Sequence, residues 1–229
     1  MSYFKNFPSI ITTNNKKNII IKDFLRRVTI SKKFRDGVVN LDDYLIKDGE
    51  TPELVSQRFY GTPENYWVIL MVNDITDPRN EWPISNQSVV DLVYLNYDFT
   101  MTVTDGSQFA KNDEIKSNNN YHFIVSSISG TTLNLRSQFK KPILTNSNTL
   151  TNVTKNISGI AISSVTDPSA VVHHYVSSDG YIVDSDYLGA TSVTNYEHEI
   201  KLNDDKRAIK ILQPNQVGLF VSTFNRLII

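Results

Sequence analysis

The clearest pattern of hydrophobic and polar positions lies in residues 41–97, where it predicts helices. Thr51-Pro52-Glu53 and Thr62-Pro63-Glu64 each place a capping threonine, a proline suited to the first helical turn, and an acid at the positive end of the helix dipole. Gly61 can end the first helix in the left-handed conformation. A third helix is predicted to begin at Ser85. Facing apolar stripes are expected on the first two helices, formed by Leu54, Val55 and Phe59 and by Trp67, Leu70 and Met71.

After Asp98 the helical pattern gives way to short β-prone runs that are rich in Ser, Thr and Asn. Turn residues divide these runs, as expected for hairpins. Two hairpins are predicted, from 121–127 with 132–135 around Gly130, and from 171–176 with 181–183 around Asp179-Gly180. The sequence therefore predicts a mainly β domain over residues 98–189.

The two ends of the chain show weaker patterns. Residues 1–40 contain isolated aromatics and a short helix or strand around Ile19–Val28, which is typical of an arm that lies either along a neighbour or on the chain's own body. Alternation in 196–202 and 208–212 predicts a third hairpin, and Pro214 opens a final helix. Its apolar face would need a surface to cover it, and it carries Val217, Phe220, Val221, Phe224 and Leu227.

These patterns together predict an α+β protein with four parts. Residues 1–40 form an extended N-terminal arm, and residues 41–97 form a small helical domain. Residues 98–189 form an inserted β domain, and residues 190–229 add a hairpin and a C-terminal helix.

Composition restricts the partners. The 229 residues include 23 basic and 24 acidic side chains, for a net charge of -1, so the chain lacks the positive field that collects nucleic acid or anionic lipid. There is no cysteine, which excludes disulfides and thiolate metal sites. No segment approaches the roughly 18 apolar residues of a membrane-spanning helix. We therefore expect synthesis in the cytoplasm and neither nucleic-acid nor membrane partners.

The sequence contains no recognisable catalytic or metal-binding motif. His173 and His174 are neighbours on a predicted strand, where alternate side chains point to opposite faces and cannot share one ion. His198 lies on another predicted strand, with the same consequence. The run from Asp184 to Gly189 lacks the third acidic ligand and the closing glutamate of a calcium loop. No nucleotide-binding or nucleophile motif occurs, so we predict no catalytic residues, no metal and no cofactor.

One segment of about 30 residues resembles a LysM module. The resemblance is carried by Tyr44 to Thr51, Leu54 to Ser56, Phe59 to Gly61, and Trp67, Ile69 and Asn73. It implies a small βααβ domain that contains the two capped helices. LysM modules ordinarily bind the N-acetylglucosamine backbone of peptidoglycan or chitin, but residues 74–85 depart from the usual second strand.

Other motifs are similar to the LysM-like baseplate wedge proteins of T-even-type contractile-tailed phages, the tail gene fifty-three family. They are Tyr-Gly-Thr-Pro-x-x-Tyr-Trp at 60–67, Met-x-Asn-Asp at 71–74, Trp-Pro-Ile-Ser at 82–85, the opening residues 2–8, and residues 195–199 and 203–212. This resemblance implies a structural virion subunit without catalysis, present in several symmetric copies. The implied partners are the core wedge heterotrimer and the sheath-like wedge subunit, with hub or tube-initiating proteins as further candidates.

The candidate contact residues follow from this resemblance. They lie in two turns that correspond to the sugar-binding edge of LysM modules, and on the final helix: Asp48, Gly49, Glu50, Thr51, Asp74, Ile75, Thr76, Asp77, Pro78, Phe220 and Phe224. A peptidoglycan-binding module at the tail tip is the alternative function. A wall hydrolase would need two carboxylates placed about a glycosidic bond, and no motif selects such a pair.

Overall fold

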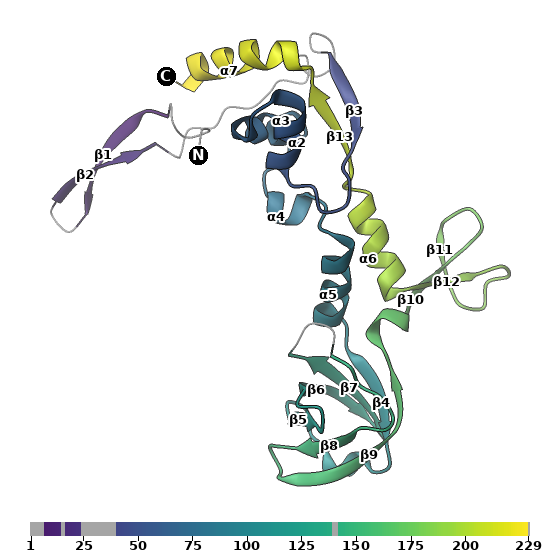
Figure 1. Cartoon of the computed structure of the whole chain (residues 1–229). Helices are drawn as coiled ribbons and strands as arrows, with labels where there is room; N and C mark the ends of the chain where they lie inside the picture. Colours follow the sequence, from purple (N-terminus) through teal and green to yellow (C-terminus); the bar gives the residue numbers. More distant parts are fainter. Residues whose placement is uncertain (1–6, 15–16, 24–39, 139–141, 229) are drawn as a thin grey trace. The chain divides into compact units, whose positions relative to one another are not determined.

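The computed structural model describes residues 7–14, 17–23, 40–138 and 142–228. The chain has an α+β fold and divides into two compact units. Figure 1 shows the chain coloured from its N-terminus to its C-terminus. Unit 1 comprises residues 1–84 and 204–229, and unit 2 comprises residues 85–203. The units are therefore divided at 84/85 and 203/204, whereas the sequence analysis placed domain limits at 97/98 and 189/190.

The two helices with Thr-Pro starts are confirmed in unit 1. Helix α2 (Pro52–Tyr60) begins after Thr51, whose hydroxyl accepts a hydrogen bond from the Leu54 amide, and ends at Gly61 with a φ of 70°. The second start forms the 3-10 turn η1 (Pro63–Asn65), which leads into α3 (Tyr66–Val72). The predicted stripe is wrong at Leu54, which is 56% exposed because α2 buries Val55 and Ser56 instead.

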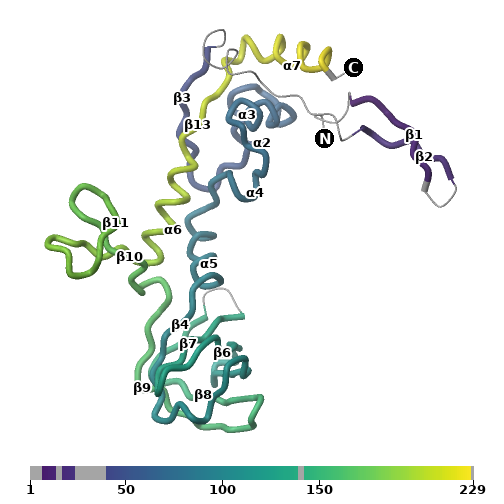
Figure 2. Tube along the Cα trace, turned by 180° about the vertical axis from the view of Figure 1, so that it is seen from behind, coloured from purple at the N-terminus to yellow at the C-terminus, as the bar shows by residue number. Residues whose placement is uncertain are grey.

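The strands of unit 1 come from distant parts of the sequence. Strand β3 (Leu41–Leu45) pairs antiparallel with β13 (Ala208–Leu212), which enters from the far end of the chain. Figures 1 and 2 both show these strands side by side. The short helix α4 (Pro78–Glu81) follows α3 directly. Residues 196–202 are helical, so the prediction that they form a hairpin with 208–212 is wrong.

Helix α3 is buried on nearly all sides, because two layers cover it. On one side it packs with β13 and Trp82 around Ile69 and Leu70. On the other side it packs against α7 (Pro214–Ile228), the predicted C-terminal helix, around Trp67 and Val68. A short helix that is apolar all round is stable only when covered in this way.

Unit 2 is built on a closed barrel of six strands, preceded by helix α5 (Asn86–Asn96) with Ser85 as its N-cap. Neighbouring strands are antiparallel in the order β4-β7-β6-β5-β8-β9. Their bounds are β4 (Phe99–Val103), β5 (Glu114–Ser117), β6 (His122–Ser129), β7 (Thr132–Ser137), β8 (Thr149–Asn152) and β9 (Ile157–Thr166). The mainly β domain and the hairpin around Gly130 are confirmed, since β6 and β7 pair across this turn.

Alternate residues of the barrel strands fill its interior. Phe99, Phe123 and Leu150 are at most 1% exposed and belong to one apolar cluster. Helix α5 adds Tyr94 to this cluster. The hydroxyl of Tyr94 donates to Asp167 at 2.6 Å, beside the 3-10 turn η3 (Pro168–Ala170). A sheet that closes on itself leaves no strand edge unpaired.

A small three-stranded sheet completes unit 2. Strand β10 (Val172–Val176) lies between β11 (Ile182–Val183) and β12 (Thr191–Thr194), and the predicted hairpin around Gly180 is confirmed. Helix α6 (Asn195–Asp204) follows β12. Its start is a capping box, because Glu197 accepts from the Thr194 amide and Thr194 accepts from the Glu197 amide.

The prediction that the neighbouring histidine rings diverge is wrong. The register of β10 against β12 shifts between Val172 and His174, which is a β-bulge at His173. A bulge interrupts the alternation of side chains. Nδ1 of His173 therefore lies only 2.8 Å from Nδ1 of His174, and His198 belongs to helix α6 instead of a strand.

The described part of the N-terminal arm is an antiparallel hairpin. It consists of β1 (Ser9–Asn14) and β2 (Lys17–Lys22), and Asp23 donates its amide to the carbonyl of Pro8 at 2.8 Å. The predicted helix or strand around 19–28 is a strand as far as Lys22, and residues 24–28 lie outside the described residues. Among the described helices, none has the length and apolar content that crossing a membrane requires.

Candidate protein-binding surfaces

The first predicted contact turn, residues 48–51, is held by a buried carboxylate. Gly49 has a φ of 72°, and the Glu50 amide donates to the Lys47 carbonyl across the turn at 3.1 Å. The carboxylate of Glu50 accepts from the Tyr44 hydroxyl at 2.6 Å and from the Lys47 amide at 2.9 Å, and it forms an ion pair with Arg58. Glu50 is 8% exposed, so its side chain points inward, away from any partner.

The electrostatics of Glu50 indicate a structural role. Burial alone would raise the pKa of its carboxyl group. The hydrogen bonds from Tyr44 and Lys47 and the charge of Arg58 outweigh burial and hold the pKa below its usual value. The carboxylate is therefore ionised at neutral pH and fixes the path of the turn.

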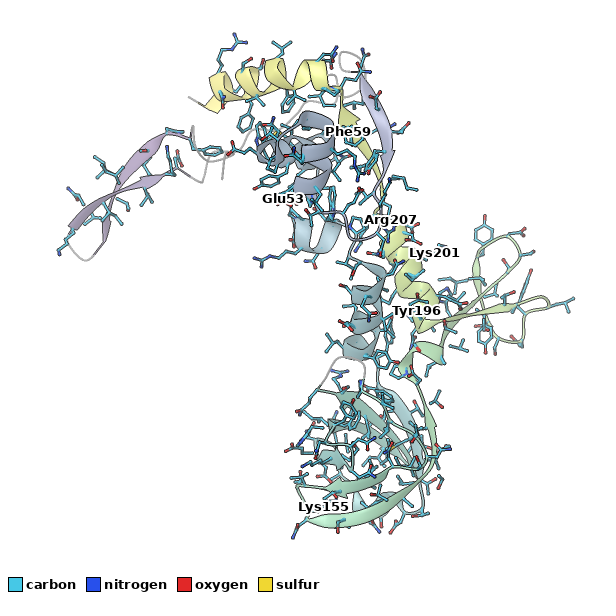
Figure 3. All side chains as sticks on the ribbon, viewed as in Figure 1. Glu53, Phe59, Lys155, Tyr196, Lys201 and Arg207 are labelled. Atoms are coloured by element: carbon cyan, nitrogen blue, oxygen red, sulfur yellow. The ribbon has the colours of Figure 1, made fainter. Side chains whose placement is uncertain are left out.

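Arg207, which directly precedes β13, reinforces the same turn from far along the sequence (Figure 3). Its guanidinium donates to the Ile46 carbonyl and pairs with Asp48 at 3.3 Å and Asp204 at 2.7 Å. Burial lowers the pKa of Arg207, but its bonds to Asp204 and Asp48 raise the pKa above the ordinary value. The sequence analysis missed this residue because nothing local links it to residues 46–48.

The second predicted turn, residues 74–78, closes helix α3 and starts helix α4. The Asp74 amide donates to Met71 and the Ile75 amide to Leu70, with Asp74 at a φ of 56°. This is a Schellman motif with aspartate in the position that glycine usually takes. Glu81 then accepts from the amides of Thr76 and Asp77 at 2.6 and 2.8 Å.

Trp82 joins the two turns. Its indole N–H donates to the Glu50 carbonyl at 2.7 Å, and the residue is 5% exposed. Its backbone amide donates to the Pro78 carbonyl at 3.3 Å, so Trp82 links the two predicted segments within unit 1. Seven of the nine turn residues are exposed, while Glu50 is buried and Ile75 is half-buried; the seven are Asp48, Gly49, Thr51, Asp74, Thr76, Asp77 and Pro78.

Phe220 and Phe224 are not surface residues, which corrects their place among the candidates. They are 8% and 4% exposed and pack on Trp67 of α3, with ring centroids 6.0 and 4.6 Å away. The ring of Phe224 also packs on that of Phe7, with the ring centroids 6.4 Å apart. The apolar face of α7 is covered by its own unit, because α3 and Phe7 offer an apolar surface there.

The most exposed apolar strand pair of unit 1 is the β1–β2 hairpin, here called the arm hairpin. Ile11 and Ile20 face each other across the strands and are 72% and 75% exposed. On the opposite face Ile10, Ile19 and Ile21 are 38–39% exposed. Figure 3 shows side chains projecting from both sides of this ribbon. The run of three isoleucines at 19–21 was the sequence signal that could have selected it.

Exposed apolar surface of this kind is typical of a subunit that binds other proteins in an assembly. Comparison with known families agrees with that class. A family model described as base plate wedge protein 53 matches residues 2–129, more than half of the 229 residues. The chain therefore belongs to this family of phage baseplate wedge proteins, which confirms the resemblance found in the sequence.

A curated relative shows the same relationship over a shorter region. The baseplate wedge protein gp53 of Enterobacteria phage T4 is 34% identical over 84 residues. These residues are 37% of this chain and 38% of the T4 protein, so the match spans well under half of that relative.

Proposed function

We propose that this chain is a structural subunit of a contractile phage tail baseplate and that it clamps wedge components together around the hub. The observation that carries the proposal is the arm hairpin, with isoleucines exposed on both faces of a two-stranded ribbon. Its family membership supplies the setting.

A two-stranded hairpin is at best marginally stable in water by itself. Covering Ile11 and Ile20 with a partner would remove apolar surface from water, worth about 25 cal/mol per Å². Strand edges of the hairpin can also add to a sheet of a neighbouring protein. Both effects favour an arm that is stabilised by the subunit it grips.

The proposed partners are the core wedge heterotrimer and the sheath-like wedge subunit, with hub or tube-initiating proteins as further contacts. Several symmetric copies in the virion baseplate would each present the same arm, as expected of a subunit in a closed ring. The exposed turn residues around Asp48 and Asp77 provide a second contact surface. The role is non-enzymatic in this proposal.

Unit 1 supports a LysM-like architecture with a changed connection. Strand β3, the two helices and β13 supply the β, α, α and β elements of such a module. The second strand comes from residues 208–212 instead of directly following α3. A module closed in this way ties residues 41–45 and 208–212 into one scaffold.

The test is reconstitution with purified wedge proteins of the same tail. Ile11→Glu places a charge in the arm hairpin and should weaken binding on the order of 10-fold or more, since apolar anchors at interfaces contribute about 2 kcal/mol. Leu219→Glu is the matched control, because Leu219 is 68% exposed on α7. Unchanged binding of Ile11→Glu, or equal loss in both variants, would contradict the proposal.

Peptidoglycan binding is the second candidate, motivated by the Gly49-Glu50-Thr51 turn. Sugar sites need precisely placed polar groups that converge on the ligand. Here Glu50, Asp48 and Glu81 already bond within unit 1, which favours protein contacts instead. Sedimentation with purified peptidoglycan distinguishes the two functions: retention that chitin oligomers compete away would support the glycan module.

A further inference from the structure

Three of the four histidines of the chain gather in unit 2, in a group here called the histidine cluster. His173 and His174 lie on β10, and His198 lies on α6. One ring nitrogen of each lies within 4.8 Å of those of the other two. The fourth, His122, lies on barrel strand β6, where it pairs with Glu114.

Local backbone structure explains why the three rings meet. The bulge at His173 interrupts the alternation of β10, so that two neighbouring rings turn toward each other. The Asn195 amide donates to the Val171 carbonyl at 2.9 Å, which fixes the start of α6 to the start of β10. His198 follows within the first turns of that helix. Figure 1 shows the beginning of α6 beside β10.

The ring geometry brings nitrogen atoms of the three histidines close together. The Nδ1 atoms of His173 and His174 are 2.8 Å apart, with their rings nearly perpendicular at 85°. The ring of His198 stacks on that of His173, with centroids 3.9 Å apart and an interplanar angle of 10°. In the absence of a cation, a hydrogen bond between the two Nδ1 atoms holds His173 to His174, and ring stacking holds His198 to His173.

We propose that the histidine cluster binds one divalent transition-metal ion of the zinc class. Imidazole nitrogen is a preferred ligand for such ions. Three histidines with a water in the fourth position are an established coordination set for Zn²⁺. Zn–N bonds of about 2.0–2.1 Å place tetrahedral ligand atoms roughly 3.4 Å apart. The three ring nitrogens of the histidine cluster already lie within 4.8 Å of one another, so small movements bring them to this spacing.

Binding requires one specific rearrangement. Lone pairs of stacked rings run parallel, so the ring of His198 tilts out of its stack on His173 to point at the ion. The Nδ1 atoms of His173 and His174 move apart by about 0.6 Å, from 2.8 Å to the roughly 3.4 Å of tetrahedral ligand atoms. Both movements are side-chain rotations and leave β10 and α6 in place.

Neighbouring residues provide an outer layer for the site. The ring of Tyr97 meets that of His173 edge-on at 5.9 Å, and the Tyr97 hydroxyl donates to Glu199 at 2.9 Å. A carboxylate next to a ligating histidine commonly orients the ring and strengthens it as a ligand. The bound ion would fasten β10 to α6 in place of the direct ring contacts, which is a structural role.

The test uses the full chain without a histidine tag, stripped with a chelator and titrated with Zn²⁺ by calorimetry and with Co²⁺ by visible absorption. We expect one ion per chain and the intense visible bands of four-coordinate Co²⁺. His198→Gln should weaken binding on the order of 10-fold or more, since loss of outer-layer contacts alone costs 10–100-fold. His122→Gln is the matched control and should bind as the wild-type chain does.

Circular dichroism of each variant establishes that it is folded before its affinity is compared. A second readout uses the wild-type chain alone: Zn²⁺ should raise the melting temperature, and the chelator should reverse the rise. Absence of saturable Zn²⁺ binding by the wild-type chain would overturn the proposal. So would a His198→Gln variant that binds Zn²⁺ as tightly as the wild-type chain, or a His122→Gln variant that loses as much affinity as His198→Gln.

Discussion

The closed barrel of unit 2 and the two-stranded sheets of unit 1 differ in whether their strand edges are paired. Every barrel strand has two hydrogen-bonded neighbours, and the barrel interior is almost completely buried. Among the described residues of unit 1, the β3–β13 and β1–β2 sheets have two strands each. Their outer edges must be satisfied by side chains, water or another protein.

The two sheets of unit 1 differ again in how this happens. Beside β13, the amide of Asn73 donates to the Lys210 carbonyl and accepts from the Lys210 N–H, so that a side chain takes the place of a neighbouring strand. The arm hairpin instead exposes isoleucines on both faces. The barrel therefore depends on its own core, whereas the arm hairpin leaves apolar side chains that its own two strands do not cover.

The largest expected effect is in the barrel. Phe123 is 0% exposed and meets Phe99 edge-on at 5.7 Å, so Phe123→Ala should lower the free energy of unfolding by about 3–5 kcal/mol. Ile124→Ala is the control on the same strand, since Ile124 is 37% exposed and should cost about 1 kcal/mol or less.

Urea unfolding followed by circular dichroism measures this loss. Both tryptophans, Trp67 and Trp82, belong to unit 1, so their fluorescence reports that unit separately. Because the barrel core shares no residue with the cores of unit 1, the fluorescence transition should move less than the circular dichroism. Equal effects of the two substitutions would contradict a barrel held by its interior.

The next effect concerns the charged turn of unit 1. Glu50→Gln removes an ionised acceptor whose side chain is 9% exposed and should cost about 1–3 kcal/mol at pH 7. The folded pKa of Glu50 is lowered, so its stabilisation is present above the unfolded pKa and is lost as pH falls through the folded pKa.

Urea unfolding followed by tryptophan fluorescence at several pH values measures the difference in free energy of unfolding between wild type and Glu50→Gln. The stability difference between wild type and Glu50→Gln should begin to shrink as pH falls below about 4, where glutamate in the unfolded chain becomes protonated, and should disappear below the lower folded pKa of Glu50. A difference that stayed constant with pH would mean that ionisation of Glu50 does not stabilise the turn.

Asn73→Ala should have a somewhat smaller effect. It removes two hydrogen bonds to Lys210 at the partly solvated edge of β13, where water can replace them, so we expect a loss of about 1–2 kcal/mol. Asn73→Asp keeps an acceptor for the Lys210 amide and loses the donor, and should fall between wild type and Asn73→Ala. Thermal unfolding followed by tryptophan fluorescence compares the three.

Local signals allowed much of this fold to be predicted from the sequence. The caps at Thr51 and Ser85, the left-handed Gly61 and the turn at Gly130 involve residues within a few positions of one another. The pairing of β3 with β13 joins residues 41–45 to 208–212, and no local pattern specifies a pairing between segments so far apart in the sequence. The alternation in 196–202 was outweighed by the capping box of Thr194 and Glu197, which starts α6.

The candidate surfaces show the same division. Asp77, predicted as a contact residue from its turn, is exposed, as turn residues commonly are, and its contact role stays a prediction. Phe224 was misplaced because its cover, α3 and Phe7, lies far away in sequence. The meeting of His173 and His174 was missed because a bulge depends on the partner strand, which the spacing of two histidines does not specify.

The smallest effect on stability is expected in the arm hairpin. Ile11→Ala removes apolar atoms from a side chain that is 72% exposed, so the free energy of unfolding of the isolated chain should change by about 0.5 kcal/mol or less. If the proposed wedge partner covers Ile11, the same substitution should also weaken binding to that partner, because it removes apolar surface from the interface. Fluorescence-monitored unfolding and the reconstitution assay, applied to one sample, separate the two quantities. A large loss of stability without loss of binding would assign Ile11 to the chain's own fold instead of to its partner.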